Sequence, residues 1–239
     1  MALSSNQIKL IRQLHLKKNR TITKEFIVEG DKLVSELLIS DWEVVQVYAL
    51  VSVAKNYNCP VQVVSEKDMA RISMLKSASS VLAVVKQKCW EPILNPSKLL
   101  LLDGINDPGN LGTIIRTADW FGFDGIVCSE NTVELYNAKV LQSTMGSVFR
   151  MPIFYQSLPD TVSRYHKKGV ASVVTHLDGS TELPAEVDAY MLIMGSESHG
   201  VSTAVTAMAN YQIKIPGFGQ AESLNVGVAT GIMCYALAR

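Results

Sequence analysis

The sequence lacks a hydrophobic run long enough to cross a membrane. A membrane helix needs about 20 consecutive apolar residues, and no run of this 239-residue chain approaches that length, although 48% of its residues are hydrophobic. The first five residues also lack the charged and then apolar pattern of a secretory signal. We therefore expect a cytoplasmic protein with no membrane partner, long enough for one large or two small domains.

Closely spaced metal ligands are also missing. The four cysteines form no CxxC pair and the four histidines have no metal-ligand spacing, which argues against a disulfide framework and against a zinc site. These residues are Cys59, Cys89, Cys128, Cys234, His15, His166, His176 and His199. Gly109 and Gly112 alone do not make a dinucleotide-binding pattern or a P-loop. We expect reduced thiols and no metal.

Acidic residues are absent from the first part of the chain. The net charge is zero, which by itself argues against a nucleic-acid partner. However, no Asp or Glu precedes Glu25, whereas six basic residues do: Lys9, Arg12, Lys17, Lys18, Arg20 and Lys24. Residues 1–92 hold 13 basic and 9 acidic residues, and residues 93–239 hold 9 and 13. A basic N-terminal patch that attracts phosphate and a solvated helix face both remain open.

The segment 88–97 divides the chain. It carries Pro92 and Pro96, which disfavour helix and indicate a linker between the two charge regimes. Before it, β-branched runs predict strands at 26–28, 44–48, 61–64 and 81–85. A first helix is expected after Ser4 or Ser5, either of which could cap it, with Ile8 and Ile11 on one face. Two further helices are expected at 31–39 and 65–74. This predicts a small α/β domain.

After the linker, strands and helices alternate with longer elements. Strands are expected at 99–103, 125–128, 171–175, 191–194 and 211–215, and helices at 111–120, 137–144, 160–168, 202–208 and 223–237. This alternation predicts a mostly parallel sheet that is covered on both faces. The domain boundaries that we expect are therefore 1–92 and 93–239.

Three loops follow predicted strands of the second domain, at the sheet edge where open α/β sheets bind ligands. The first runs from Asn106 into the helix that carries Arg116. An arginine in such an apolar helix needs a partner if it is buried, and the candidates are Glu197 and an RNA phosphate or ribose. The second loop, Gly195-Ser-Glu-Ser-His-Gly200, follows an apolar strand, and the third contains Glu222-Ser-Leu-Asn-Val226.

In this order, the three loops resemble the three motifs of the SpoU (TrmH-type) RNA 2′-O-methyltransferases. The matching residues are Pro108-Gly-Asn-Leu-Gly with Arg116, then Gly195 to Gly200, then Ile215-Pro followed by Glu222-Ser-Leu-Asn-Val. The run 26–34, Phe-Ile-Val-Glu-Gly-Asp-Lys-Leu-Val, resembles the ribosomal-protein-like substrate-binding domain of many members. Two departures stand out. Ser198-His199 replaces the usual glycine and variable residue. Gly227 replaces a serine, and because glycine costs a helix about 1 kcal/mol relative to alanine, this predicts close packing there.

The resemblance implies a fold, a cofactor and a reaction. The fold is the SPOUT α/β fold with a C-terminal trefoil knot in residues 93–239 and an RNA substrate-binding domain in residues 1–92. S-adenosylmethionine would bind at Gly195, Ile215 and Leu224, and its methyl group would pass to a ribose 2′-hydroxyl in rRNA or in tRNA. The implied catalytic residues are Arg116, Asn110, Glu197, Ser223 and Asn225. Members of the family are dimers, so we expect a homodimer.

Other interpretations of the same residues stay open. Gly195 would merely end a strand, Ile215 and Leu224 would be core residues, and Asn110 would cap a helix. Asn225 would be a satisfied structural amide. The departures leave open a non-catalytic RNA-binding protein that keeps the knot. A serine hydrolase using Ser198 with His176 or His199 is a third possibility, because residues 196–200 come close to the GxSxG pattern.

Overall fold

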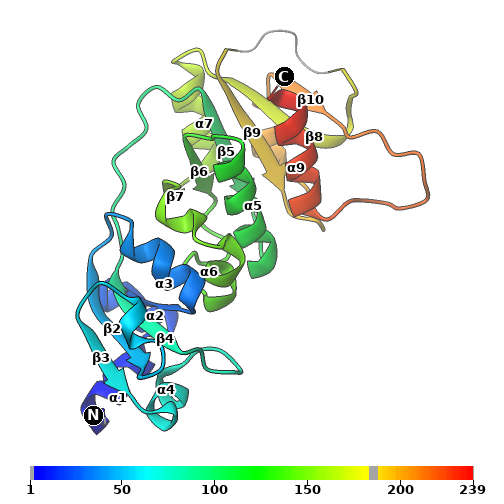
Figure 1. Ribbon diagram of the computed structural model, residues 1–239. Helices are drawn as coiled ribbons and strands as arrows, with labels where there is room; N and C mark the ends of the chain where they lie inside the picture. Colours follow the sequence, from blue (N-terminus) through cyan, green and yellow to red (C-terminus); the bar gives the residue numbers. More distant parts are fainter. Residues whose placement is uncertain (1–2, 183–187, 239) are drawn as a thin grey trace. The chain divides into compact units, whose positions relative to one another are not determined.

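The computed structural model describes residues 3–182 and 188–238, which form two compact units (Figure 1). The first unit comprises Met1–Cys89 and Glu134–Phe149, and the second comprises Trp90–Val133 and Arg150–Arg239. This differs from the division expected from the sequence, which assigned residues 134–149 to the second domain.

Side chains and hydrogen bonds explain why this later segment belongs to the first unit. The segment contains helix α6 (Ala138–Thr144), which packs on strand β1 (Glu25–Glu29). Gln142 donates its side-chain N–H to the carbonyl of Glu29, and the indole N–H of Trp42 donates to the carbonyl of Phe149. The sequence pattern of the segment predicted the helix, but it did not indicate the surface on which the helix packs.

The first unit is a four-stranded mixed sheet with helices around it. The strand order is β1-β4-β2-β3, in which β4 is antiparallel to β1 and β2, and β2 and β3 are parallel. The remaining elements are α1 (Ser5–Gln13), α2 (Lys17–Thr23), α3 (Asp31–Leu38), β2 (Val44–Leu50), η1 (Ala54–Asn56), β3 (Val61–Val64), α4 (Glu66–Ile72), β4 (Val81–Lys86) and η2 (Ser147–Phe149). Ser4 caps α1, and Gln7 completes a capping box. The pattern missed α2.

The second unit is a six-stranded parallel sheet in the order β10-β8-β9-β5-β6-β7. Its elements are β5 (Lys98–Asp103), α5 (Pro108–Trp120), β6 (Gly125–Cys128), β7 (Ile153–Tyr155), α7 (Leu158–His166), β8 (Ala171–Ser180), β9 (Tyr190–Gly195), α8 (Thr203–Thr206), β10 (Tyr211–Ile213) and α9 (Val226–Leu237). The α/β class and the parallel sheet are confirmed. The sequence missed β7, and it began α9 three residues too early.

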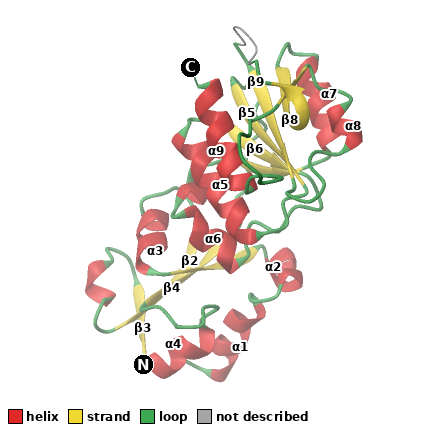
Figure 2. Cartoon of the chain, turned by 90° about the vertical axis from the view of Figure 1, so that its right-hand side faces the viewer, coloured by secondary structure: helices red, strands yellow, loops and turns green. Residues whose placement is uncertain are grey.

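The sheet of the second unit is covered on both faces, as its apolar strands predict. Residues 99–102 of β5 are fully buried, and so are Met191, Leu192 and Ile193 of β9. Figure 2 shows α5 and α9 on one face and α7 and α8 on the other. Because β5 and β9 are neighbours and parallel, the loops that follow them leave the sheet side by side. The trefoil knot stays a prediction.

Candidate active site

Three of the predicted site residues meet in one hydrogen-bonded cluster, although they lie far apart in the sequence. Asn110 comes from the first turn of α5, Glu197 follows β9, and Asn225 precedes α9. The Asn110 Nδ2–Glu197 Oε1 distance is 3.0 Å, and Asn225 Nδ2 lies 2.7 Å from Glu197 Oε1 and 2.9 Å from Asn110 Oδ1. We call these three residues the polar cluster. It lies at the carboxyl end of the parallel sheet, where such folds bind ligands.

Helix caps fix the two asparagines of the cluster. Asp107, not Asn110, caps α5, because its carboxylate accepts from the Asn110 N–H at 2.9 Å, and Pro108 follows in the first turn. The interpretation of Asn110 as the helix cap is therefore wrong. Asn225 does cap α9, because its Oδ1 accepts from the N–H groups of Gly227 and Val228 at 3.0 and 3.3 Å. That cap orients the Asn225 amide so that Nδ2 faces Glu197.

Glu197 is the acceptor that joins the cluster. Its Oε1 accepts from both asparagine side chains and also from the Val226 N–H at 3.1 Å. A carboxylate that accepts several N–H groups forms charge-assisted bonds, which are stronger than neutral ones. Within residues 3–182 and 188–238, no cation pairs with Glu197. The pairing of Glu197 with Arg116, one of the two partners considered for that arginine, is thus not formed.

Gly195 is required by the tight loop that carries Glu197. The loop closes on itself through a bridge between Ser196 and Gly200, and the Gly200 N–H donates to the Ser196 carbonyl at 2.9 Å. A Cβ on Gly195 would lie 1.9 Å from the carbonyl carbon of Gly200, so no side chain fits. Gly200 itself has a φ of +65°, which favours glycine. The interpretation that Gly195 only ends a strand is incomplete, since its lack of a side chain shapes the loop.

Ser198 and His199 occupy the exposed tip of the same loop. Ser198 Oγ and His199 Nδ1 are 2.7 Å apart, a normal distance between a nucleophile and its base. A catalytic pair also needs an acid or carbonyl that orients the second ring nitrogen, and in the described part of the chain His199 has no such partner. His176 lies in β8, where its Nδ1 accepts from the Asp178 N–H. The geometry of the loop gives no support to a hydrolase.

Arg116 lies on the solvent side of α5 and is not buried. It shares that side with Thr113 and with Trp120, whose exposed fraction is 84%. Among the described residues, none forms a hydrogen bond or an ion pair with the Arg116 guanidinium. Of the two partners considered for Arg116, the internal carboxylate is therefore ruled out among the described residues, because the arginine side chain reaches water and needs no internal partner. It leaves a cation free for an external anion.

The segment 215–224 between β10 and α9 is open. No main-chain group of these ten residues is hydrogen-bonded within the described part of the chain. Leu224 is 45% exposed, so the core interpretation is wrong for it, and Ile215 is half-buried. Ser223 is exposed and lies two residues before Asn225. The segment thus offers free main-chain donors and acceptors together with two apolar side chains.

Gly227 confirms the close packing that its place in a helix predicts. It is buried in the first turn of α9, which packs against α5. A Cβ at this position would lie 3.2 Å from Asn225 Oδ1 and 3.4 Å from Thr113 Cγ2. Glycine therefore lets α5 and the cap of α9 approach each other, and the polar cluster bridges these two elements.

Several other features of the described residues bear on the site. No group of three or more His, Cys, Asp or Glu side chains in residues 3–182 and 188–238 is placed to hold a metal ion. In the same ranges, none of the helices is both long and apolar enough to span a membrane. The four cysteines are free thiols. Sequence reasoning missed Asp103, whose carboxylate accepts from the Ser202 N–H at 2.9 Å and ties β5 to the loop after β9. No local signal distinguishes it.

Comparisons with known proteins agree with the geometry of the three loops. The sequence model of the SpoU rRNA Methylase family matches residues 97–235, which is more than half of the chain and includes the polar cluster. The chain belongs to this family of RNA methyltransferases. The model of the MRM3-like substrate binding domain matches residues 5–83 of this chain. The family expected from the motifs is confirmed, and the hydrolase interpretation loses its support.

Individual relatives resemble this chain over nearly its full length. The 23S rRNA (guanosine(2553)-2′-O)-methyltransferase RlmP of Bacillus subtilis is 34% identical, over 98% of this chain and 96% of that protein. A TrmH-family structure from Porphyromonas gingivalis has a TM-score of 0.89 at 32% identity and covers 98% of both chains. An AdoMet-bound rRNA methyltransferase structure from Sinorhizobium meliloti has a TM-score of 0.87 at 32% identity, covering 98% of this chain and 95% of that one.

Proposed function

We propose that the protein transfers the methyl group of S-adenosylmethionine to a ribose 2′-hydroxyl in 23S rRNA. The polar cluster is the observation that carries this proposal, since it joins the three loops whose motifs define the family. The name of the Bacillus subtilis relative supports 23S rRNA as the substrate and a guanosine as the first position to examine. The AdoMet-bound relative supports the methyl donor.

The residues present fit the proposed methyl donor. S-adenosylmethionine supplies an electrophilic methyl group on a sulfonium, and it carries an adenosine without phosphates. Free main-chain groups of segment 215–224 suit the edges of an adenine, and the Ile215 and Leu224 side chains suit its apolar faces. Gly195 keeps the neighbouring loop narrow. These three residues are the proposed binding residues for the donor.

The side chains of the protein would then position the ribose and stabilise charge. A guanidinium with a pKa above about 12 is a poor base, so the free cation of Arg116 would hold the RNA phosphate and ribose and offset the developing oxyanion. Asn110, Glu197, Ser223 and Asn225 would form the polar wall beside the hydroxyl. Alignment of the reacting atoms alone is worth about 7–11 kcal/mol.

A non-catalytic RNA-binding protein is the alternative that the two departures left open. Gly227 no longer supports it, because the packing of α5 against α9 accounts for the glycine. Ser198 and His199 lie at an exposed loop tip and leave Asn110, Glu197 and Asn225 joined. Binding of S-adenosylmethionine without methyl transfer to any RNA would favour this alternative over the proposed reaction.

Mapping of ribose methylation tests the proposed reaction. Purified protein, tritiated S-adenosylmethionine and unmodified 23S rRNA transcript should give a labelled RNA that alkaline hydrolysis leaves uncut at one bond. The same position should lose its 2′-O-methyl group in cells without this gene and regain it when the gene is restored. Asn225→Ala protein is the matched control. 16S rRNA and tRNA, tested as alternative substrates, should take up no label. Label in tRNA alone would refute the proposed substrate.

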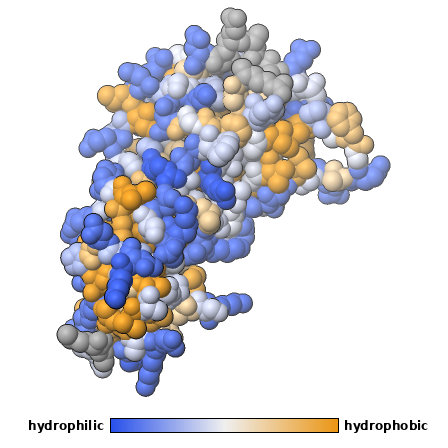
Figure 3. All heavy atoms as spheres, in the orientation of Figure 1, coloured by the Kyte–Doolittle hydropathy of each residue, from blue (hydrophilic) through white to orange (hydrophobic). Residues whose placement is uncertain are grey.

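Exposed apolar side chains on the second unit favour a homodimer. Val228, Ile232 and Tyr235 lie along one side of α9 and are 53%, 41% and 57% exposed, and Figure 3 shows hydrophobic residues gathered over α9. Trp120 of α5, which packs against α9, is also exposed, at 84%. A second copy of the chain would cover these side chains. Light scattering should give twice the mass of one chain, and Ile232→Glu should give the mass of a single chain with unchanged helix content.

A further inference from the structure

The outward sides of α1 and α2 in the first unit carry a group of exposed cations. We call the following residues the α1–α2 basic face: Lys9, Arg12, Lys17, Lys18 and Lys24, all of which are exposed. In α1 the apolar residues Ile8 and Ile11 are buried, so Lys9 and Arg12, three residues apart, share the side that faces away from the core. The basic face therefore follows from the helical periodicity of a sequence segment that has no acidic residue.

The cations of this face have no counter-charges among the described residues, unlike four other cations of the first unit. Lys32, Arg71, Lys86 and Lys88 pair with carboxylates at 2.6 to 3.5 Å. In the described part of the chain, none of the five residues of the basic face forms an ion pair. Five unpaired cations within 16 residues repel one another and attract an anion of several charges.

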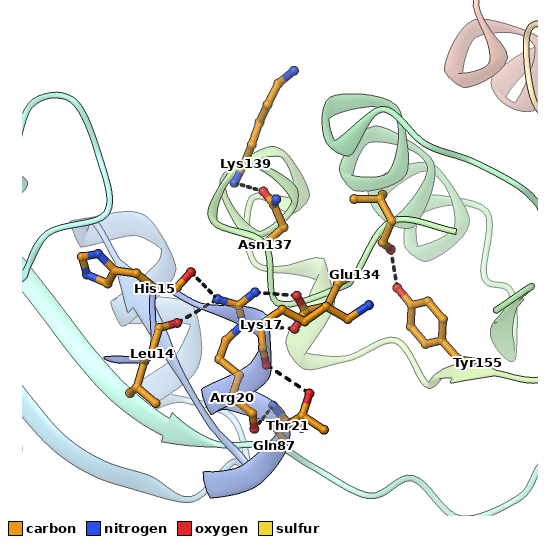
Figure 4. A network of polar contacts seen from close by, with 11 residues as sticks. Leu14, His15, Lys17, Arg20, Thr21, Gln87, Glu134, Asn137, Lys139 and Tyr155 are labelled. Atoms are coloured by element: carbon orange, nitrogen blue, oxygen red, sulfur yellow. Dashed lines mark hydrogen bonds and ion pairs between the residues drawn. The ribbon is translucent and has the colours of Figure 1, made fainter. Parts of the chain in front are cut away.

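Arg20 fixes the two helices that display the basic face. It is only 4% exposed, and its guanidinium donates to the carbonyls of Leu14 and His15 at the end of α1 and to the Glu134 carboxylate (Figure 4). His15 also bonds through Nε2 to the Ile72 carbonyl at 3.0 Å. Arg20, the sixth basic residue of the segment, thus points inward and holds the end of α1 next to α2. The spacing of the outward cations is therefore set before any partner binds.

Apolar side chains interrupt the cations and help to choose the partner. Leu10 of α1, Leu16 at the start of α2 and Ile22 of α2 are 55%, 62% and 69% exposed. An anionic membrane would need a continuous apolar side to insert, but the apolar side of α1 is already buried in the core. RNA offers phosphates together with less polar ribose and base surfaces, which fits scattered apolar residues among cations.

We propose that the α1–α2 basic face binds the phosphate backbone of the RNA substrate and contributes most of its affinity. This inference rests on the proposed function, because it assigns to one surface the binding of the RNA that is methylated. The substrate-binding domain match covers residues 5–83 as a whole and does not distinguish this face from the sheet or from α3 and α4. Each phosphate contact releases counterions, so the face should give binding a steep salt dependence.

Charge reversal on the basic face tests the inference in the full-length protein. Lys17→Glu with Lys18→Glu changes the face, and Lys55→Glu with Lys67→Glu makes the same charge change at two exposed lysines of the first unit outside it. Binding of a 23S rRNA transcript is measured by filter retention between low and physiological salt. The first variant should bind at least tenfold more weakly, and the slope of log K against log salt should fall by about 1.4–1.8, as expected for two lost phosphate contacts. The control should stay within twofold of the wild type.

Further readouts separate the inference from the proposed function. Steady-state methylation by the Lys17→Glu, Lys18→Glu protein should show the loss mainly in KM for RNA, with S-adenosylmethionine binding unchanged. If this variant binds and methylates RNA as the wild type does, the inference is wrong and the proposed function stands. If instead it loses only binding to vesicles of phosphatidylcholine and phosphatidylglycerol, the partner is a membrane and the inference is also wrong. If wild-type protein binds the transcript but methylates no RNA, the proposed function fails.

Discussion

Asn225 has two roles that one pair of substitutions can separate. Its Oδ1 caps α9, and its Nδ2 donates to Glu197 and Asn110. Asn225→Ala removes both roles. Asn225→Ser keeps a side-chain oxygen that can cap the helix, because serine and asparagine are about equally good caps, but it removes the amide donor. The two variants should therefore differ in stability and agree in activity.

The magnitudes follow from the contacts of each atom. Loss of an N-cap costs about 1 kcal/mol. The exposed bonds to Glu197 and Asn110 add about 0.5–1 kcal/mol, because solvent competes for them. We expect Asn225→Ala to lower the free energy of unfolding by about 2 kcal/mol and Asn225→Ser by about half as much. For a protein of this size, the melting temperatures should differ by about 2–4 °C.

Thermal unfolding and methyl transfer are measured on the same preparations. Both variants should lose at least 10²-fold in methyl transfer if the amide N–H holds the polar wall against the reacting hydroxyl. Asn225→Ser with wild-type activity would show that the cluster is only structural. Equal melting temperatures for the two variants would show that the cap of α9 contributes little.

Other substitutions and conditions give separate checks. Arg116→Ala should change the free energy of unfolding by less than about 0.5 kcal/mol, because the side chain is exposed and has no partner in the described structure, yet lower methyl transfer about 10²-fold or more in a filter assay, with little rescue by lysine. Gly195→Ala should abolish S-adenosylmethionine binding in calorimetry, because its Cβ overlaps the loop backbone. Burial raises the pKa of Cys234 from 9.0 to about 12 and raises that of Cys128 too. An unfolded thiol ionises first, so urea denaturation should show the free energy of unfolding fall as the pH rises above 9.0.

Sequence patterns predicted the helices and strands of this protein better than they predicted which surfaces those elements pack against. Runs such as 99–102 and 125–128 are apolar along their whole length, which is typical of a parallel strand covered on both faces. The strand β7 was missed because three residues are too short to show a period. The sequence pattern placed the start of helix α9 at Ser223, whereas the helix begins after Asn225, which caps it by bonding the first turn.

The segment 134–149 shows why domain membership could not be predicted. Its local pattern gave the helix α6 and nothing more, because burial of Val140 and Leu141 depends on a surface supplied by residues far away in the sequence. The Arg20–Glu134 ion pair has the same origin, since 114 residues separate its partners. Interactions at such separations leave no periodic trace in one sequence.

The polar cluster also shows how much of the candidate active site one copy of the chain assembles by itself. Asn110 and Arg116 are six residues apart on α5, which is about 9 Å along the axis and well around the helix. Arg116 therefore points to solvent while Asn110 faces Glu197. In a homodimer the Arg116 side chain of one copy could complete the cluster of the other. Mixing Arg116→Ala and Asn225→Ser subunits, each inactive alone, should then restore about a quarter of wild-type activity, because half of the dimers carry one intact site. No restoration after verified subunit exchange would place Arg116 and Asn225 in the same copy's site and refute a shared one.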